Sequence, residues 1–189
     1  MSGKLIILSG PSGAGKSTLA RHLLENTEFN LSFSISACSR KKRETEVHGR
    51  DYYFLSIDEF KAKVEENEFL EWEEVYPGHY YGTLKIEVEG LRALGKNVIF
   101  DVDVMGGLSI KRHYKEEAIS IFIAPPSPEI LEKRLTDRNT ETPENLVKRV
   151  RKARMEMTYA RKYDHIITND NLDLAQQEVT RLVQDFLKG

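Results

Sequence analysis

A glycine-rich loop between an apolar run and a helix-forming segment constrains the fold of this chain more than any other feature. Residues 5–8 read Leu-Ile-Ile-Leu, which is typical of a buried strand. The pattern Gly-x-x-x-x-Gly-Lys-Ser follows over residues 10–17. Leucines at helical spacing then predict a helix over Thr18–Asn26. A strand, such a loop and a helix in this order predict a phosphate-binding loop, whereas a turn without a ligand would not need this context.

Each residue type in this loop suits contact with phosphate. Glycines let the chain curl without Cβ clashes, so that successive backbone N–H groups point at an anion. The helix that begins near Lys16 adds the positive end of its dipole. We expect Lys16 to reach the β- and γ-phosphates of a nucleoside triphosphate and the Ser17 hydroxyl to ligate Mg²⁺. The predicted triphosphate-binding residues are Gly10, Pro11, Ser12, Gly13, Ala14, Gly15, Lys16, Ser17 and Thr18.

The bulk composition limits the possible partners. A net charge of -2 with 31% charged residues indicates an ordinary surface that does not favour nucleic-acid binding. Basic clusters at residues 40–43 and 148–154 suit a small anionic ligand, although each is also compatible with a solvated face. No apolar run approaches the ~18 residues of a membrane helix, and the amino terminus has no targeting pattern. With Cys38 as the single cysteine, no internal disulfide is possible. We expect a cytoplasmic protein without a membrane partner.

Apolar runs that alternate with helical segments predict an α/β fold with a mainly parallel sheet. Further strands are predicted at residues 31–35, 98–102, 119–123 and 166–167, and helices at 129–135, 143–159 and 174–187. Ligands of such sheets gather at the carboxyl ends of the strands. Gly10, Ser36, Asp101 and Asn169 each follow a predicted strand, and we expect them to meet at one edge of the sheet. A strand that ends in aspartate, here Asp101, often holds Mg²⁺ or its waters.

The segment from residue 36 to 96 has a different texture. It is rich in Tyr and Glu, with short β-like runs such as 52–55 and a helix predicted over 57–67. Ser56 and Asp58 are the candidate caps of that helix. We interpret the segment as a lobe inserted into the core.

Further residues resemble one family. The spaced pattern over residues 36–54 is similar to the signature of guanylate kinases, and so are the segments 69–72, 80–83, 101–103, 124–127, 134–138 and 169–170. The pattern comprises Ser36, Arg40, Arg43, Glu46, Gly49, Asp51, Tyr52 and Phe54. These segments run in order through nearly the whole chain.

The resemblance implies a P-loop NTPase three-layer fold in one domain. Its core would comprise residues 1–35, 97–128 and 156–189, with a GMP-binding lobe over 36–96 and a helical lid over 129–155. It implies transfer of the γ-phosphoryl group of ATP to GMP and dGMP with Mg²⁺, and the products with GMP would be ADP and GDP. It also implies an open form that closes when both nucleotides are bound. The sequence leaves open whether the protein is a monomer or a homodimer.

The acceptor site follows from the chemistry of GMP. Arginines three residues apart can grip one phosphate, and phenols add donors. Guanine presents N1–H and a 2-amino group, which a carboxylate can accept together. Spacing alone does not choose among the glutamates of residues 68–74, whereas the resemblance selects Glu71. The GMP-binding residues that the resemblance implies are Ser36, Arg40, Arg43, Tyr52, Glu71, Tyr81, Thr83, Asp101, Asp103 and Arg149.

The transfer needs charge neutralisation more than a general base, because the acceptor phosphate is already a nucleophile. By resemblance, the catalytic residues are Lys16 with the lid arginines Arg134, Arg138 and Arg149, which would stabilise the charge of the transition state. Arg134, Arg138 and Asn169 would also contact ATP, Asn169 near the adenine. Asp101 could serve either Mg²⁺ or, through Arg40, the GMP pocket.

Two other functions compete with this one. Some scaffold proteins carry a guanylate-kinase-like domain that has lost catalysis and binds peptides, but such domains typically lack the loop lysine or the lid arginines. A related kinase of the same fold could use a different phosphorylated acceptor. The pair of Glu71 with Ser36 favours a guanine base.

Overall fold

The computed structural model describes residues 2–136 and 143–189. It divides into two compact units. The lobe unit comprises residues 32–98 together with those before Leu5, and the core unit comprises residues 5–31 and 99–189. The two units are described separately below.

The core unit contains the parallel strands that the apolar runs predict. β1 (Leu5–Ser9) pairs in parallel with β8 (Ala118–Ala124), which pairs in parallel with β9 (His165–Thr168). The full sheet has the order β2-β7-β1-β8-β9, in which β2 is Leu31–Phe33 and β7 is Asn97–Asp101. Every residue of β1 and β8 is buried, as continuous apolar runs in a parallel sheet require.

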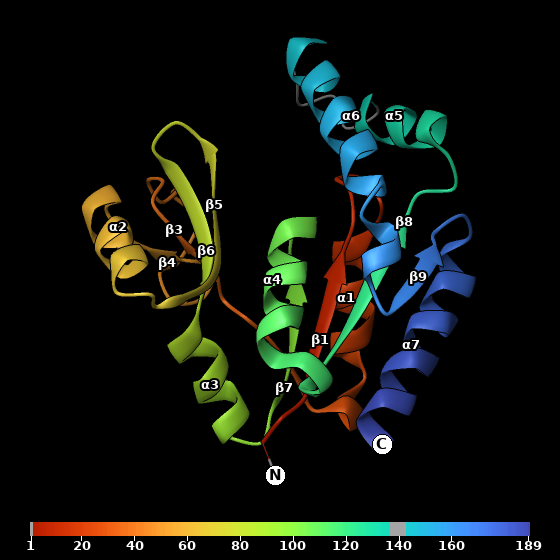
Figure 1. The fold of residues 1–189 in the computed structure, drawn as a ribbon, viewed down its shortest axis with the longest axis horizontal. Coiled ribbons are helices and arrows are strands. Elements are labelled where there is room, and N and C mark those ends of the chain that lie inside the picture. The colour runs from red at the N-terminus through yellow and green to blue at the C-terminus, as the bar shows by residue number, and fades with distance from the viewer. Residues whose placement is uncertain (1, 137–142) are drawn as a thin grey trace. The chain divides into compact units, whose positions relative to one another are not determined.

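Helices cover both faces of this sheet (Figure 1). The core-unit helices are α1 (Lys16–Glu25), α4 (Val104–Tyr114), α5 (Pro128–Thr136), α6 (Pro143–Met157) and α7 (Leu172–Lys188). Because side chains alternate along a strand, Ile121 and Ile123 pack with α1 and α7, while Phe122 and Ala124 pack on the face of Val104 in α4. The result is the three-layer arrangement of a P-loop NTPase.

The lobe unit has its own sheet of order β4-β3-β6-β5. Its elements are β3 (Ala37–Cys38), β4 (Tyr53–Phe54), α2 (Ile57–Glu65), β5 (Phe69–Tyr76), β6 (His79–Leu84) and α3 (Lys85–Ala93). Phe60 of α2 stacks on Phe69, with ring centroids 4.4 Å apart, and on Tyr80 at 5.5 Å. Ser56, one of the two candidate caps, closes a capping box with Glu59 at the start of α2.

Several predicted boundaries were wrong. The first helix begins at Lys16 rather than Thr18, the strand from Leu31 ends at Phe33, and α2 ends at Glu65. Asn67 adopts a left-handed conformation, with φ 56°, that does not continue a helix. Neither α3 nor α4 was predicted. In α4, two consecutive glycines disfavour a helix, and its burial depends on packing against the sheet.

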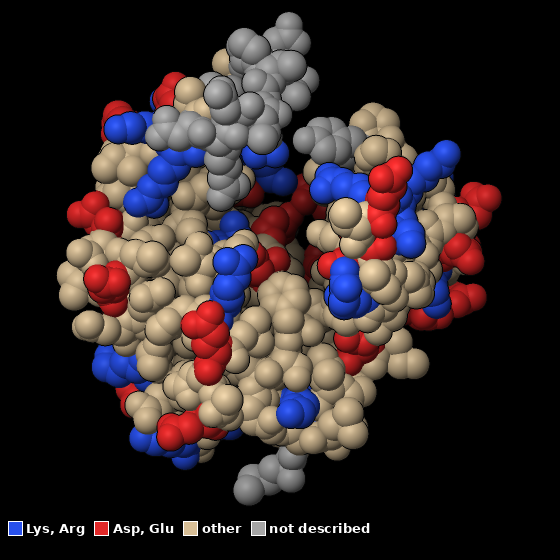
Figure 2. Space-filling view, turned by 180° about the vertical axis from the view of Figure 1, so that it is seen from behind, with Lys and Arg blue, Asp and Glu red and all other residues tan. Residues whose placement is uncertain are grey.

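The surface carries charges of both signs. Figure 2 shows Lys and Arg interspersed with Asp and Glu on the face drawn, in keeping with the net charge of -2. Within the described residues, no helix is both long enough and apolar enough to cross a membrane.

The lobe sheet leaves no room for a side chain at position 82, and this permits a stability test. A Cβ at Gly82 would lie 2.8 Å from the Glu71 carbonyl oxygen and 2.9 Å from side-chain atoms of Phe69 and Trp72. We expect Gly82→Ala to lower the free energy of unfolding by about 1–3 kcal/mol, as overpacking does. Gly90→Ala in exposed α3, where a Cβ would have no neighbour within 4 Å, is the control and should be neutral or stabilising. Urea unfolding measures both, and equal destabilisation would contradict the expected crowding at position 82.

Candidate active site

The loop between β1 and α1 has the curled backbone that phosphate binding requires. Gly10 has φ 142°, and a Cβ there would lie 2.2 Å from the Ile123 carbonyl oxygen in β8. Only glycine fits this close approach. The Lys16 ammonium donates hydrogen bonds to the carbonyl oxygens of Gly10 at 2.8 Å and Pro11 at 3.3 Å, so its side chain curls back over the loop. No acidic residue occupies the first turn of α1, which leaves the positive end of the helix dipole uncompensated.

A hydroxyl and a carboxylate meet at the start of α1. The Ser17 hydroxyl donates a hydrogen bond to Asp101, the last residue of β7. Both groups are hard oxygen ligands of the kind that Mg²⁺ prefers. Among the described residues, no cluster of three or more His, Cys, Asp or Glu side chains is placed to hold a metal ion. Mg²⁺ bound with substrate phosphates needs only one or two protein ligands, so this pair fits it.

Asn169 and Arg134 are tied to the same loop. Asn169 follows β9 and is 6% exposed, and its side-chain amide donates to the Ala14 carbonyl oxygen at 2.8 Å. The Arg134 guanidinium in α5 donates to the Asn169 carbonyl oxygen at 3.0 Å. The structure therefore joins two predicted ATP contacts to the phosphate-binding loop.

The remaining core-unit residues of the prediction are less directly connected. Arg149 lies in α6 and is half-buried, and Arg138 lies outside the described residues. Asp103 caps α4, because its carboxylate accepts a hydrogen bond from the Gly106 backbone N–H at 2.7 Å. This capping role was not predicted from the sequence, and contact of Asp103 with guanine stays a prediction.

The lobe unit places an arginine among aromatic side chains. The Arg40 Nε–H donates to the Tyr81 hydroxyl at 3.2 Å, and the guanidinium carbon lies 5.0 Å from the Tyr52 ring centroid. The Tyr52 and Tyr81 rings meet edge to face at 6.0 Å. Partial burial raises the pKa of Tyr52, so this phenol stays protonated and able to donate. Three of the predicted phosphate ligands thus form one cluster.

Glu46, to which the sequence assigned no role, holds Arg40 with both carboxylate oxygens. Its Oε1 and Oε2 accept from the guanidinium at 2.6 and 2.7 Å, and Oε2 also accepts from the Arg43 backbone N–H at 2.8 Å. Arg40 foremost, and then the Arg43 N–H, lower the pKa of Glu46 to about 2. An acidic partner could be suspected from the run Arg-Lys-Lys-Arg-Glu-Thr-Glu, but the run itself does not distinguish Glu44 from Glu46.

A β-bulge determines which way Glu71 faces. Phe69 lies opposite Leu84 and Glu71 opposite Thr83, so β5 advances two residues while β6 advances one. The extra residue turns Glu71 to the face opposite Phe69, which is buried in the lobe core with Leu84. The Thr83 hydroxyl, in a residue only 1% exposed, donates to Glu71 Oε1 at 2.5 Å.

The structure also separates the four candidate glutamates. Glu68 forms an ion pair with Lys63 at 2.8 Å, and Glu74 accepts a hydrogen bond from the Gly78 N–H at 2.8 Å. Glu73 lies opposite Tyr81 and shares the face of Glu71. Glu71 is distinguished from Glu73 by the hydrogen bond from Thr83 described above.

Two other predicted GMP ligands lie in the same unit. The Ser36 carbonyl oxygen accepts from the Tyr53 backbone N–H at 2.9 Å, which joins it to β4. Ser36 is half-buried, whereas Arg43, the second of these ligands, is exposed. Cys38 is buried and its pKa is raised by burial, as expected for a cysteine that is not a nucleophile.

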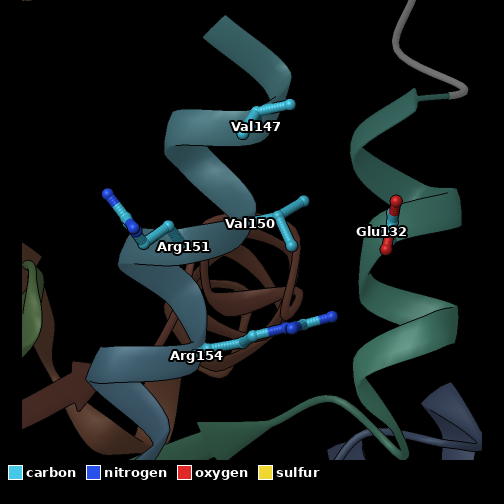
Figure 3. Close-up of a pocket in the computed structure, with 5 residues that line it drawn as sticks. All are labelled: Glu132, Val147, Val150, Arg151 and Arg154. Carbon is cyan, nitrogen blue, oxygen red and sulfur yellow. The ribbon is translucent and has the colours of Figure 1, made fainter. Parts of the chain in front are cut away.

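A separate pocket lies between α5 and α6. It measures about 460 Å³ and is lined by Glu132, Val147, Val150, Arg151 and Arg154. Figure 3 shows Val147, Val150 and Arg154 directed toward α5, while Arg151 points away from it. None of these lining residues is a predicted nucleotide ligand.

Comparison with known proteins identifies the family of this chain. The family model described as guanylate kinase matches residues 2–186. A guanylate kinase of Bacteroides thetaiotaomicron is 52% identical over 99% of this chain and 91% of its own length. One of Porphyromonas gingivalis is 50% identical over 97% of this chain and 98% of its own. The crystal structure of a guanylate kinase from Anaplasma phagocytophilum matches with a TM-score of 0.76 and 28% identity, covering 100% of this chain and 88% of that one.

The motif order, the three-layer core and these full-length similarities have one common explanation. The chain belongs to the guanylate kinase family and is a nucleoside monophosphate kinase.

Proposed function

We propose that this kinase transfers the γ-phosphoryl group of ATP to GMP, and to dGMP, in purine nucleotide metabolism of the cytoplasm. The products with GMP are ADP and GDP. The observation that carries the choice of acceptor is the Glu71 carboxylate held by buried Thr83. A fixed carboxylate can accept hydrogen bonds from guanine N1–H and the 2-amino group. Adenine has neither of these two donors. Ser36 and Asp103 are proposed as further base contacts.

The acceptor phosphate is proposed to bind beside Tyr81, two residues before Thr83 in β6. Tyr81 and Thr83 are two residues apart in β6, so they lie on one face of the lobe sheet. Tyr81 contacts Arg40, which stacks near Tyr52. With Arg43, these residues supply the cationic and phenolic donors that a phosphate requires.

ATP is proposed to bind the core unit. Backbone N–H groups of residues 10–18 would surround its phosphates, Lys16 would move from the loop carbonyls to the β- and γ-phosphates, and Asn169 would lie near the adenine. Ser17 and Asp101 would hold Mg²⁺, which neutralises phosphate charge when bound. The Ser17–Asp101 hydrogen bond favours the magnesium role of Asp101 over a role in the GMP pocket.

The acceptor needs no general base, because the GMP phosphate oxygen is already ionised at neutral pH. Lys16, Arg134, Arg138 and Arg149 are proposed to stabilise the negative charge that spreads over the transferred group. The hydrogen bond of Arg134 to Asn169 supports a position for this arginine beside the nucleotide.

A coupled assay of ADP release tests the proposal with GMP, dGMP, AMP and IMP as acceptors, each with and without EDTA. We expect GMP to exceed AMP in kcat/KM by about 10⁴-fold, because a site matched to one hydrogen-bond pattern rejects a mismatched one by this order. IMP, which lacks the 2-amino group, should be intermediate, and EDTA should abolish turnover. Preference for another phosphorylated acceptor would replace the proposal, and binding without any turnover would favour a catalytically inactive binding module.

A further inference from the structure

We propose that Glu46 is a positioning residue that orients the arginines for the acceptor phosphate, and that Arg43 rather than Arg40 supplies the uncompensated positive charge. This inference rests on the proposed use of a nucleoside monophosphate as acceptor. In this inference a carboxylate orients the groups that bind phosphate, although a carboxylate by itself repels phosphate.

The contacts of Glu46 connect both arginines. The carboxylate bonds the Arg40 guanidinium through two parallel hydrogen bonds of 2.6 and 2.7 Å. Its Oε2 also accepts from the Arg43 backbone N–H at 2.8 Å. The side chains of the pair are only 12% and 13% exposed, for Arg40 and Glu46 respectively, so the geometry is protected from solvent. Bidentate pairs of this kind fix direction as well as distance.

A count of donors shows how little of Arg40 remains for a ligand. A guanidinium has five N–H groups. In Arg40, Nε–H donates to Tyr81 at 3.2 Å, and one N–H on each terminal nitrogen donates to Glu46. A further N–H of the first terminal nitrogen donates to the Lys41 carbonyl oxygen at 3.1 Å. One N–H is left. It is on Nη2, whose other N–H donates to Glu46 Oε1, so this hydrogen bond fixes the direction of the remaining donor.

The charge balance points to Arg43. The Arg40–Glu46 pair has no net charge, so it offers a phosphate a directed donor but no net attraction. The Arg43 side chain is exposed and has no hydrogen-bond partner among the described residues, while Glu46 holds its backbone. Arg43 is therefore the member of the site that can still contribute a full positive charge.

The surrounding loop depends on such contacts, because little regular structure supports it. Residues 39–52 lie between β3 and β4, and the Arg40 guanidinium is also placed 5.0 Å from the Tyr52 ring and 5.5 Å from the Phe54 ring. A second carboxylate anchors the same loop without contact to Arg40. Asp51 accepts from the Val47 N–H at 2.7 Å and from the Arg50 guanidinium at 2.8 Å. Asp51 thus provides a matched control for loop folding.

The test compares the affinities of GMP and guanosine, which differ only by the phosphate. Competition binding gives the dissociation constants of both ligands for the wild type, Glu46→Gln and Asp51→Asn. The quantity compared is the dissociation constant of guanosine divided by that of GMP, which measures how much the phosphate adds to affinity. We expect Glu46→Gln to reduce this ratio by about 10–100-fold, because removal of hydrogen bonds to a charged group weakens binding on that scale. Guanosine affinity and the KM for ATP should not change. Asp51→Asn should keep the ratio of the wild type.

Two further variants make the result decisive. Glu46→Asp retains the charge on a shorter side chain and should recover part of the ratio, which a purely structural requirement for the loop would not predict. Arg43→Ala should reduce the GMP affinity and its salt dependence more than Arg40→Lys does. An unchanged ratio in Glu46→Gln, or an equal loss of guanosine and GMP binding, would overturn the inference. A wild type that binds guanosine as tightly as GMP would instead refute the proposed acceptor.

Discussion

Replacing Lys16 by methionine is expected to lower kcat for phosphoryl transfer by about 10³-fold or more, the scale at which a cation acting on the transferred phosphoryl group contributes. The ammonium is at the phosphate-binding loop, where it bonds the carbonyl oxygens of Gly10 and Pro11. In the proposed reaction the ammonium would move to the β- and γ-phosphates of ATP. There it would stabilise the negative charge that increases toward the transition state. Methionine keeps an unbranched apolar side chain of nearly the same length and removes the ammonium, with its charge and its hydrogen-bond donors.

The fold should survive this substitution, because Lys16 is the half-buried first residue of α1 and methionine is also a good helix former. Steady-state kinetics with GMP measures the effect, and thermal unfolding checks the fold. Lys115→Met, which removes the same charge from an exposed lysine after α4, is the matched control and should keep the activity of the wild type. Turnover of Lys16→Met within tenfold of the control would refute the assigned role.

Replacing Glu71 by glutamine is expected to lower kcat/KM for GMP by about 10²–10³-fold and to reduce the preference for GMP over AMP. The amide retains one acceptor oxygen but turns an NH₂ group toward a donor of guanine, so that buried donors are left unpaired. Thr83 would still be able to donate to the remaining oxygen. The KM for ATP should not change, because ATP is proposed to bind the core unit.

The strand itself provides the controls for this prediction. Glu73→Gln alters the same face of β5, and Glu74→Gln alters the opposite face, so the three variants separate base recognition from a general loss of negative charge. Kinetics with GMP, IMP and AMP measures all three. A larger loss in Glu73→Gln than in Glu71→Gln would transfer the role of guanine reader to Glu73. Equal small losses in all three variants would show that none of them reads the base.

The sequence was sufficient where a local pattern determines both structure and chemistry. Gly10, Lys16 and Ser17 lie within eight residues of one another. Their spacing, with the apolar run before them and the leucines after them, predicts a strand, a turn and a helix that surround phosphate. The apolar runs of β1 and β8 likewise identify a buried parallel sheet, because burial on both faces requires continuous apolar residues. These features depend on neighbours along the chain.

Tertiary structure decided the features that depend on distant partners. The sequence of residues 68–74 presents four glutamates of equal chemistry, and only the bulge in β5 and its pairing with β6 bring Glu71 to Thr83. In the same way, only the folded loop shows that Glu46 and not Glu44 bonds Arg40. The phosphate-binding loop could be predicted from the sequence because its ligands are consecutive backbone groups. Spacing alone did not identify the acceptor site, for which the prediction depended on the family resemblance. Its side chains are oriented by register and by hydrogen bonds between separate segments, which spacing does not encode.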